Sequence, residues 1–261
     1  MSRVEGDTEV TTPKHDISKT NEYRTRYEMT VACRISDMKG LSDDCGGFTV
    51  ARIPGENAVL MRGQHQNPGL VTVSGLHKCN IDDEPVFKKN HPVNGGALQM
   101  AVSVIKARPD VGCAFHGHTP ASMVFSALEV ELLPISQFGT MFCGKINKMP
   151  ALEDVNTSDW CEVLVDQLGD NPALLFANHG ILVVGRDCRQ ALHNLYALEQ
   201  AMTVQISAMQ TGAKITVLSE EAVIKNQELY WGGDPTTDYD GSREWDSWVE
   251  RVRRADPHFA D

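Results

Sequence analysis

The sequence lacks the features that would assign it to several specialised classes of protein. Lys and Arg number 24 against 35 Asp and Glu, so the net charge of −11 provides no excess of basic groups for nucleic-acid phosphates or an anionic membrane. No run approaches the roughly 18 apolar residues of a membrane span, and the N-terminus is too polar for a signal peptide. We therefore expect a soluble, cytoplasmic protein that binds neither nucleic acid nor membrane.

Cysteine pairs are also lacking. The seven cysteines are widely spaced and form no C-x-x-C motif, which argues against a disulfide framework and predicts reduced thiols. What the chain does have is 41% hydrophobic and 23% charged residues over 261 positions, enough for one large globular domain or two small ones.

The pattern along the chain predicts three parts. Residues 1–18 have no periodicity and are expected to form a mobile arm. Residues 19–212 alternate strands and helices without a linker, which favours a single α/β domain, and residues 213–261 read as a C-terminal helical extension packed on the core or on a neighbouring subunit. Within this scheme the expected strands are 47–53, 57–63, 70–81, 111–118, 130–136, 173–177 and 180–185, and the expected helices are 20–39, 97–108, 119–128, 158–168, 187–211 and two short ones capped by Ser219 and Ser242.

Three histidines stand out by position. His116 and His118 are two residues apart at the end of a predicted strand, so their side chains point the same way. His179 lies in an Asn-His-Gly turn after another buried strand. Three imidazoles from two strand ends would make an open site for Zn²⁺ or a similar divalent ion. A histidine pair without metal is the alternative.

These segments resemble the class II aldolase/adducin family. The resemblance rests on ARPDVGCAFHGHTPASMVFSAL, LLPIS and LLFANHGILVVGRDCRQALHNLYALEQA, and it covers about residues 20–211. It implies a three-layer α/β fold with a mixed central sheet flanked by helices. It also implies that His116, His118 and His179 hold a divalent ion, Zn²⁺ first and Mn²⁺, Fe²⁺ or Co²⁺ as alternatives, in a homotetramer.

Two positions depart from the sugar-phosphate aldolases of this family. Their catalytic glutamate lies 19 residues before the first metal histidine, where this chain has Ala97, and Phe48 replaces the Asn of their phosphate-binding turn. The Pro-Val-Asn segment at 92–94 instead resembles the adducin-like branch, which includes cytoskeletal adducins and metal-dependent decarboxylases.

The expected function is therefore a metal-dependent carbon–carbon lyase. Decarboxylation of a small anionic substrate, a hydroxy-aromatic or β-keto acid, through a metal-stabilised enolate fits best because it needs only a proton donor and no aldolase glutamate. The alternatives are an aldolase with a different acid/base and a non-catalytic adducin-like interaction domain. The chain has no long Lys-rich tail of the adducin kind.

Four further residues are candidates for the site by the same resemblance. Gln137 and His65 are expected in catalytic roles, and Arg62 and Asn94 in substrate binding, with Arg62 suited to a bidentate carboxylate contact. The alternatives are an ordinary hydrogen-bonding role for Gln137 and a solvated surface position for Arg62 and His65.

Overall fold

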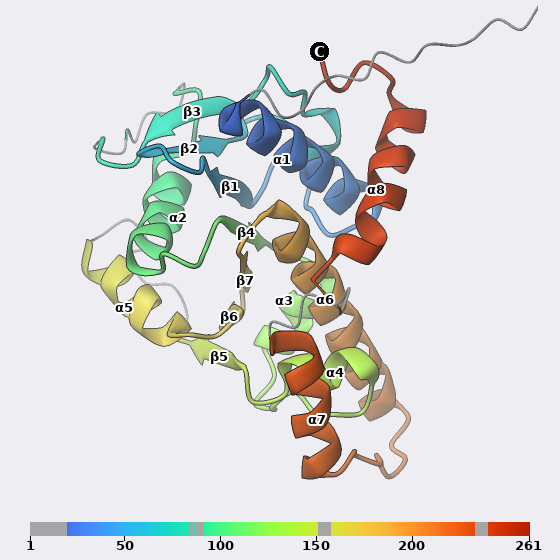
Figure 1. The fold of residues 1–261 in the computed structure, drawn as a ribbon. Coiled ribbons are helices and arrows are strands. Elements are labelled where there is room, and N and C mark those ends of the chain that lie inside the picture. Colours follow the sequence, from blue (N-terminus) through green and yellow to red (C-terminus); the bar gives the residue numbers. More distant parts are fainter. Residues whose placement is uncertain (1–19, 84–85, 87–90, 151–157, 233–239) are drawn as a thin grey trace, which may run out of the picture.

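The fold is described from a computed structural model, which describes residues 20–83, 86, 91–150, 158–232 and 240–261. The predicted arm, residues 1–18, lies outside the described residues. The helices are α1 (Asn21–Met38), α2 (Gly95–Ala107), α3 (Pro120–Ser126), α4 (Gln137–Phe142), α5 (Ser158–Leu168), α6 (Cys188–Gln210), α7 (Glu220–Trp231) and α8 (Ser242–Ala255), with a 3-10 helix η1 (Pro68–Leu70) (Figure 1). The strands are β1 (Phe48–Arg52), β2 (Ala58–Met61), β3 (His77–Asn80), β4 (Cys113–Gly117), β5 (Ile146–Met149), β6 (Ala173–Phe176) and β7 (Gly180–Gly185).

The strands form one sheet in the order β3-β2-β1-β4-β7-β6-β5. Only β5 and β6 pair in parallel, and every other neighbouring pair is antiparallel. The expected mixed sheet is therefore confirmed. At its centre β4 pairs with β7, with His116 opposite Leu182. His116 therefore lies on the middle strand of the sheet, and His118 directly follows that strand.

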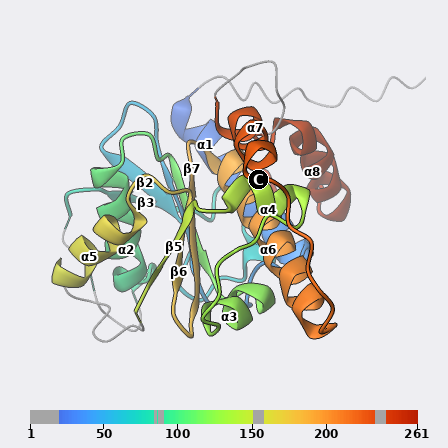
Figure 2. The ribbon, with the colours of Figure 1, turned by 90° about the horizontal axis from the view of Figure 1, so that it is seen from below.

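Helices cover both faces of the sheet, which confirms the three-layer arrangement (Figure 2). Side chains alternate along β4, so Cys113 and Phe115 join the core under α1 and α6, while Ala114 joins the core under α2 and α5. Both cores are built from buried, mainly aliphatic and aromatic side chains. Because both faces of β4, β6 and β7 are buried, the centre of the sheet is a rigid platform.

The C-terminal helices pack on the α1 and α6 side of the molecule. α8 lies against α1 and α6, and α7 lies against α4. The last residues fold back beyond α8: Phe259 is buried and its ring lies 5.3 Å from that of Tyr27, while Arg34 pairs with Asp256 at 2.9 Å. None of the helices in the described ranges is long and apolar enough to span a membrane.

The strand predicted over 130–136 is absent, and the one predicted over 70–81 is confirmed only at β3. Both differences have the same cause. Residues 130–136 form no strand, because the Gln205 side chain from α6 accepts from the Leu133 N–H at 2.7 Å and donates to the Glu131 carbonyl at 2.8 Å. Residues 70–76 also lie outside the sheet; the Val71 carbonyl accepts from Arg34 and the Val73 N–H donates to the Phe259 carbonyl. Side chains and the C-terminal segment thus replace a neighbouring strand.

Other elements differ in detail from the sequence predictions. The sequence predictions do not include the edge strand β5 or the helix α4, because these elements have only four and six residues and are too short for a clear periodic pattern. Ser219 caps α7 as predicted by accepting from the Ala222 N–H. Ser242 does not cap α8; Gly241, with φ of 89°, holds that position.

Candidate metal centre

The centre is built from the end of β4 and the turn between β6 and β7. His116 lies in β4, and His118 follows its last residue. His179 lies in the turn, where Asn178 adopts a left-handed conformation with φ of 56° that Asn tolerates better than most residues. Gly180 is needed at the start of β7, since a Cβ there would collide with the Gly117 carbonyl oxygen and would also lie 3.0 Å from the His118 ring. The local backbone therefore aims three imidazoles at one point.

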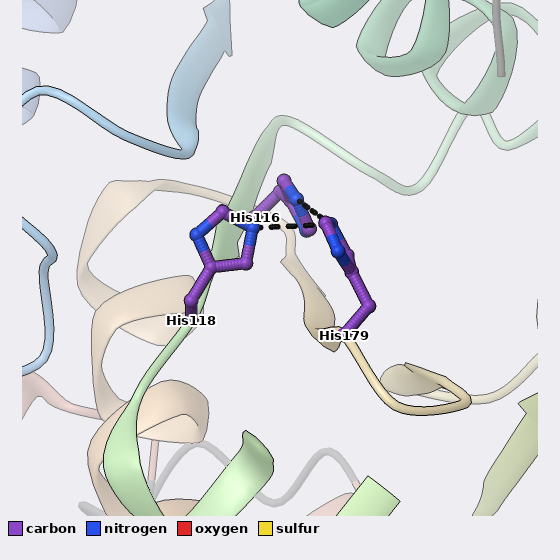
Figure 3. A group of neighbouring side chains, drawn as sticks. All are labelled: His116, His118 and His179. Atoms are coloured by element: carbon purple, nitrogen blue, oxygen red, sulfur yellow. Dashed lines mark hydrogen bonds between the residues drawn. The ribbon is translucent and has the colours of Figure 1, made fainter. Parts of the chain in front are cut away.

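The three Nε2 atoms converge (Figure 3). The Nε2 atom of His179 lies 3.0 Å from that of His118 and 3.3 Å from that of His116. Zinc–nitrogen bonds of about 2.0–2.1 Å at tetrahedral angles separate two ligand nitrogens by about 3.3–3.4 Å. The three histidines therefore fit a divalent ion. Among the described residues, they are the group of side chains placed to hold a metal.

The other ring nitrogens orient two of the ligands. His116 Nδ1 lies 3.0 Å from the Ile181 carbonyl, which can only accept, so Nδ1 carries the proton and Nε2 presents its lone pair. His118 Nδ1 lies 2.6 Å from Asp43 Oδ2 and is fixed in the same way by a carboxylate. Both tautomers leave Nε2 ready to bind a cation.

The surroundings keep the imidazoles of His116 and His179 neutral. The His116 ring packs between Phe48 and Phe176, with ring centroids 5.4 and 5.3 Å away. Burial lowers the pKa of His116 to about 3, with further contributions from the neighbouring His118 and His179. Burial also lowers the pKa of His179. Neutral imidazole is the form that binds metal, so the site is prepared for its ligand at neutral pH.

Acid should destabilise the metal-free protein through His116. In the unfolded chain this group takes up a proton near pH 6.5, whereas in the fold it does so only near pH 3. Between these values the unfolded state binds one more proton, so the free energy of unfolding should fall by about 1.4 kcal/mol per pH unit as pH decreases. Urea unfolding of metal-free protein at pH 6, 5 and 4 measures this slope. A His116→Gln variant with an equal slope would contradict the assignment.

A buried carboxylate fixes the segment after His118. Thr119 is fully buried and donates to Glu199 of α6, and Glu199 Oε1 accepts from the Ala121 N–H at 3.0 Å. Thr119 makes no cap of its own to α3, so Glu199 satisfies this helix start from another element. The start of α3 is thereby tied to α6 directly beyond the metal ligands.

Arg62 is placed differently from the sequence expectation. Its side chain is 3% exposed and donates to the carbonyls of Gln66 at 2.7 Å, Cys45 at 3.1 Å and Gly47 at 2.8 Å, and also to that of Gly46. Neither a solvated surface charge nor an open carboxylate-binding group describes it. Arg62 anchors the loop between α1 and β1.

Among the described residues, Gln137 and Asn94 make no hydrogen bond to the three histidines. Gln137 is exposed at the start of α4. His65 is exposed, and its carbonyl accepts from Cys45 Sγ at 3.4 Å. Asn94 caps α2, with its side chain accepting from the Ala97 N–H at 3.0 Å. Their catalytic and binding roles stay predictions.

Sequence reasoning missed Asp43 and Glu199. Asp43 is one of two adjacent aspartates in a polar loop, so nothing in the sequence singles it out. The sequence does contain an indication of Glu199, since it is a charged residue beside Leu198 on the apolar face of the long helix, where a buried carboxylate needs partners.

The fold and the site together define an α/β protein with a three-histidine centre suited to a divalent ion.

Comparisons with known proteins agree with this class. The family described as Class II Aldolase and Adducin N-terminal domain matches residues 27–206. A Pseudomonas aeruginosa protein provisionally assigned to aldolase class 2 is 24% identical over 246 residues, covering 91% of this chain and 92% of that protein. The chain therefore belongs to the class II aldolase and adducin family.

Two further relatives show the breadth of the family. Rat beta-adducin is 28% identical over 221 residues, which cover 80% of this chain but 30% of that adducin. The solved structure of an aldolase II superfamily protein from Pseudomonas syringae matches with a TM-score of 0.81 at 26% identity, covering 92% of this chain and 96% of that one. The fold prediction is confirmed by this likeness.

Proposed function

We propose that this protein is a metal-dependent lyase that breaks a carbon–carbon bond, and that it decarboxylates a small carboxylated substrate, a hydroxy-aromatic or β-keto acid. The observation that supports the proposal best is the convergence of three imidazoles, in which His179 Nε2 lies 3.0 Å from His118 Nε2 and 3.3 Å from His116 Nε2. The proposal includes a homotetramer, a cytoplasmic location, and Zn²⁺ before Mn²⁺, Fe²⁺ or Co²⁺.

The three histidines would hold the ion, and a bound divalent ion would supply a Lewis acid that polarises a substrate oxygen as the bond breaks. Neutral ligands add no negative charge, so the ion's positive charge remains available to attract an anionic substrate. The Ile181 carbonyl and Asp43 keep the rings of His116 and His118 in place. The protein's part is thus to fix the ligands before substrate arrives.

The residue at position 97 favours decarboxylation over aldol cleavage. Ala97 lies in the first turn of α2 and has a methyl group where the resemblance places the aldolase glutamate. A methyl group cannot exchange a proton, whereas loss of CO₂ requires only that the resulting carbanion be protonated. Gln137 and His65 remain the proposed groups for orientation and proton delivery, and Asn94 for substrate contact. Arg62 is withdrawn as a substrate ligand because its guanidinium is buried on four carbonyls.

A non-catalytic role is the second candidate, favoured by the similarity to rat beta-adducin over 80% of this chain. The three-histidine geometry alone does not separate an enzyme from an interaction domain, because both branches of the family can carry it. An aldolase with another acid/base is the third.

Product analysis separates the three candidates. The protein is loaded with Zn²⁺, Mn²⁺, Fe²⁺ or Co²⁺ and incubated with a panel of hydroxy-aromatic acids, β-keto acids and sugar phosphates. We expect CO₂ release from at least one carboxylated substrate, and no release from a His116→Ala variant carried as the matched control. Aldehyde release without CO₂ would support the aldolase. Neither product, with metal bound, would overturn the lyase proposal.

A further inference from the structure

The loop between α1 and β1, residues 43–47, approaches the metal centre from outside the sheet. Asp43 Oδ2 accepts from His118 Nδ1 at 2.6 Å. The other carboxylate oxygen, Oδ1, is buried and has no hydrogen-bond partner among the described residues. Within the described ranges, the carboxylate therefore hydrogen-bonds only to His118.

The backbone of the loop makes room for this carboxylate. A Cβ on Gly46 would lie 2.7 Å from Asp43 Cγ, closer than real Cβ contacts allow. Asp43 therefore rests directly against the glycine backbone. Any larger residue at position 46 would push the carboxylate away from His118.

Arg62 holds the same loop from the other side. Its buried guanidinium donates to the carbonyls of Cys45, Gly46 and Gly47, three consecutive residues. Because these carbonyls are gathered on one cation, the loop has little freedom to move relative to β2. The position of Asp43 is therefore set by the fold.

We propose that Asp43 is a positioning residue for the metal, acting through His118, and that Gly46 and Arg62 hold its carboxylate in place. The inference rests on the proposed metal site. An Nδ1–H donated to a carboxylate fixes the tautomer and ring orientation of a histidine ligand and makes its Nε2 a better donor. His116 is oriented instead by a neutral carbonyl, that of Ile181, so the charge-assisted contact is confined to His118 among these two ligands.

The test compares metal affinities of intact variants by competition with a fluorescent zinc chelator. Asp43→Ala is expected to weaken Zn²⁺ binding by about 10–100-fold, the usual effect of losing such a partner. Asp43→Asn keeps an acceptor oxygen and should lose less. Gly46→Ala should weaken binding in the same direction although it removes no polar group.

Asp44→Asn is the matched control. The Asp44 carboxylate lies in the same loop but accepts from the Asn67 side chain at 2.7 Å and not from His118. The Zn²⁺ affinity of this variant should equal that of the wild type. The visible absorption spectrum of Co²⁺-loaded protein provides a second measurement, because a reoriented His118 changes the ligand field. We expect a changed spectrum for Asp43→Ala and Gly46→Ala, and an unchanged one for Asp44→Asn.

Equal Zn²⁺ affinities and equal Co²⁺ spectra for wild type, Asp43→Ala and Gly46→Ala would overturn the positioning role while leaving the metal site intact. Failure of the wild type to bind Zn²⁺ or Co²⁺ would instead overturn the proposed function on which the inference rests. The two failures are distinguished by the wild-type measurement alone.

Discussion

Replacing His179 with alanine is expected to reduce bound metal from about one ion per chain to near zero. His179 Nε2 faces both other ligand nitrogens, at 3.0 and 3.3 Å, so its loss opens the site on one side. Structural zinc sites bind with about 10–16 kcal/mol; losing one of three protein ligands should therefore cost about 3–5 kcal/mol, or roughly 10²–10⁴-fold in affinity. Any lyase activity should fall with it.

Elemental analysis of protein after gel filtration measures this loss directly. The matched control is His258→Ala, because the His258 side chain is 83% exposed and lies in the C-terminal segment. It should retain the wild-type metal content. Equal metal content in wild type and His179→Ala would rule out the assignment of His179 as a ligand.

The second large effect is expected for stability, in Arg62→Met. Methionine fills a similar volume but donates no hydrogen bond, so the carbonyls of residues 45–47 and 66 lose their buried partner. Each unsatisfied buried acceptor costs about 1–3 kcal/mol. Allowing for partial rearrangement of the loop, the free energy of unfolding should fall by about 3–5 kcal/mol.

The measurement is urea unfolding of the metal-free protein, which separates loop anchoring from any effect through the ion. If Arg62 were instead exposed in an open site that binds a substrate carboxylate, the same substitution would change the free energy of unfolding by no more than about 0.5 kcal/mol. Arg254→Met is the control, since that side chain is 79% exposed and pairs with Glu250 on its own helix. A change for Arg62→Met as small as for this control would show that Arg62 does not anchor the loop.

The parts of the site that the sequence predicted are those with short-range patterns. The two-residue spacing of His116 and His118 and the Asn-His-Gly turn at His179 determine side-chain direction locally. The partners that orient these rings come from elsewhere: Asp43 is 75 residues from His118, and the Ile181 carbonyl is 65 residues from His116. No local pattern encodes such pairings, so only the fold reveals them.

The strand errors have a similar origin. Residues 130–136 are rich in apolar and β-branched residues, as strands are. The Gln205 side-chain amide binds both a donor and an acceptor of the segment, and the Leu218 N–H donates to the Pro134 carbonyl. The residue composition of a segment can indicate that its backbone is extended and half-buried. It does not indicate whether a neighbouring strand or a side chain satisfies its backbone hydrogen bonds.

The central β4–β7 pairing affects the order of events during folding. His118 and His179 are separated by 61 residues and meet only when these two strands have paired, so the unfolded chain does not present the complete set of three nitrogens. Contacts of such long sequence separation form slowly, because closing the intervening chain costs entropy. An ion that binds only the completed site would stabilise the native state by mass action, by about 2.7 kcal/mol at a free concentration 100 times its dissociation constant. Metal supply during expression would then influence how much chain survives proteolysis, independently of any catalytic requirement for the ion.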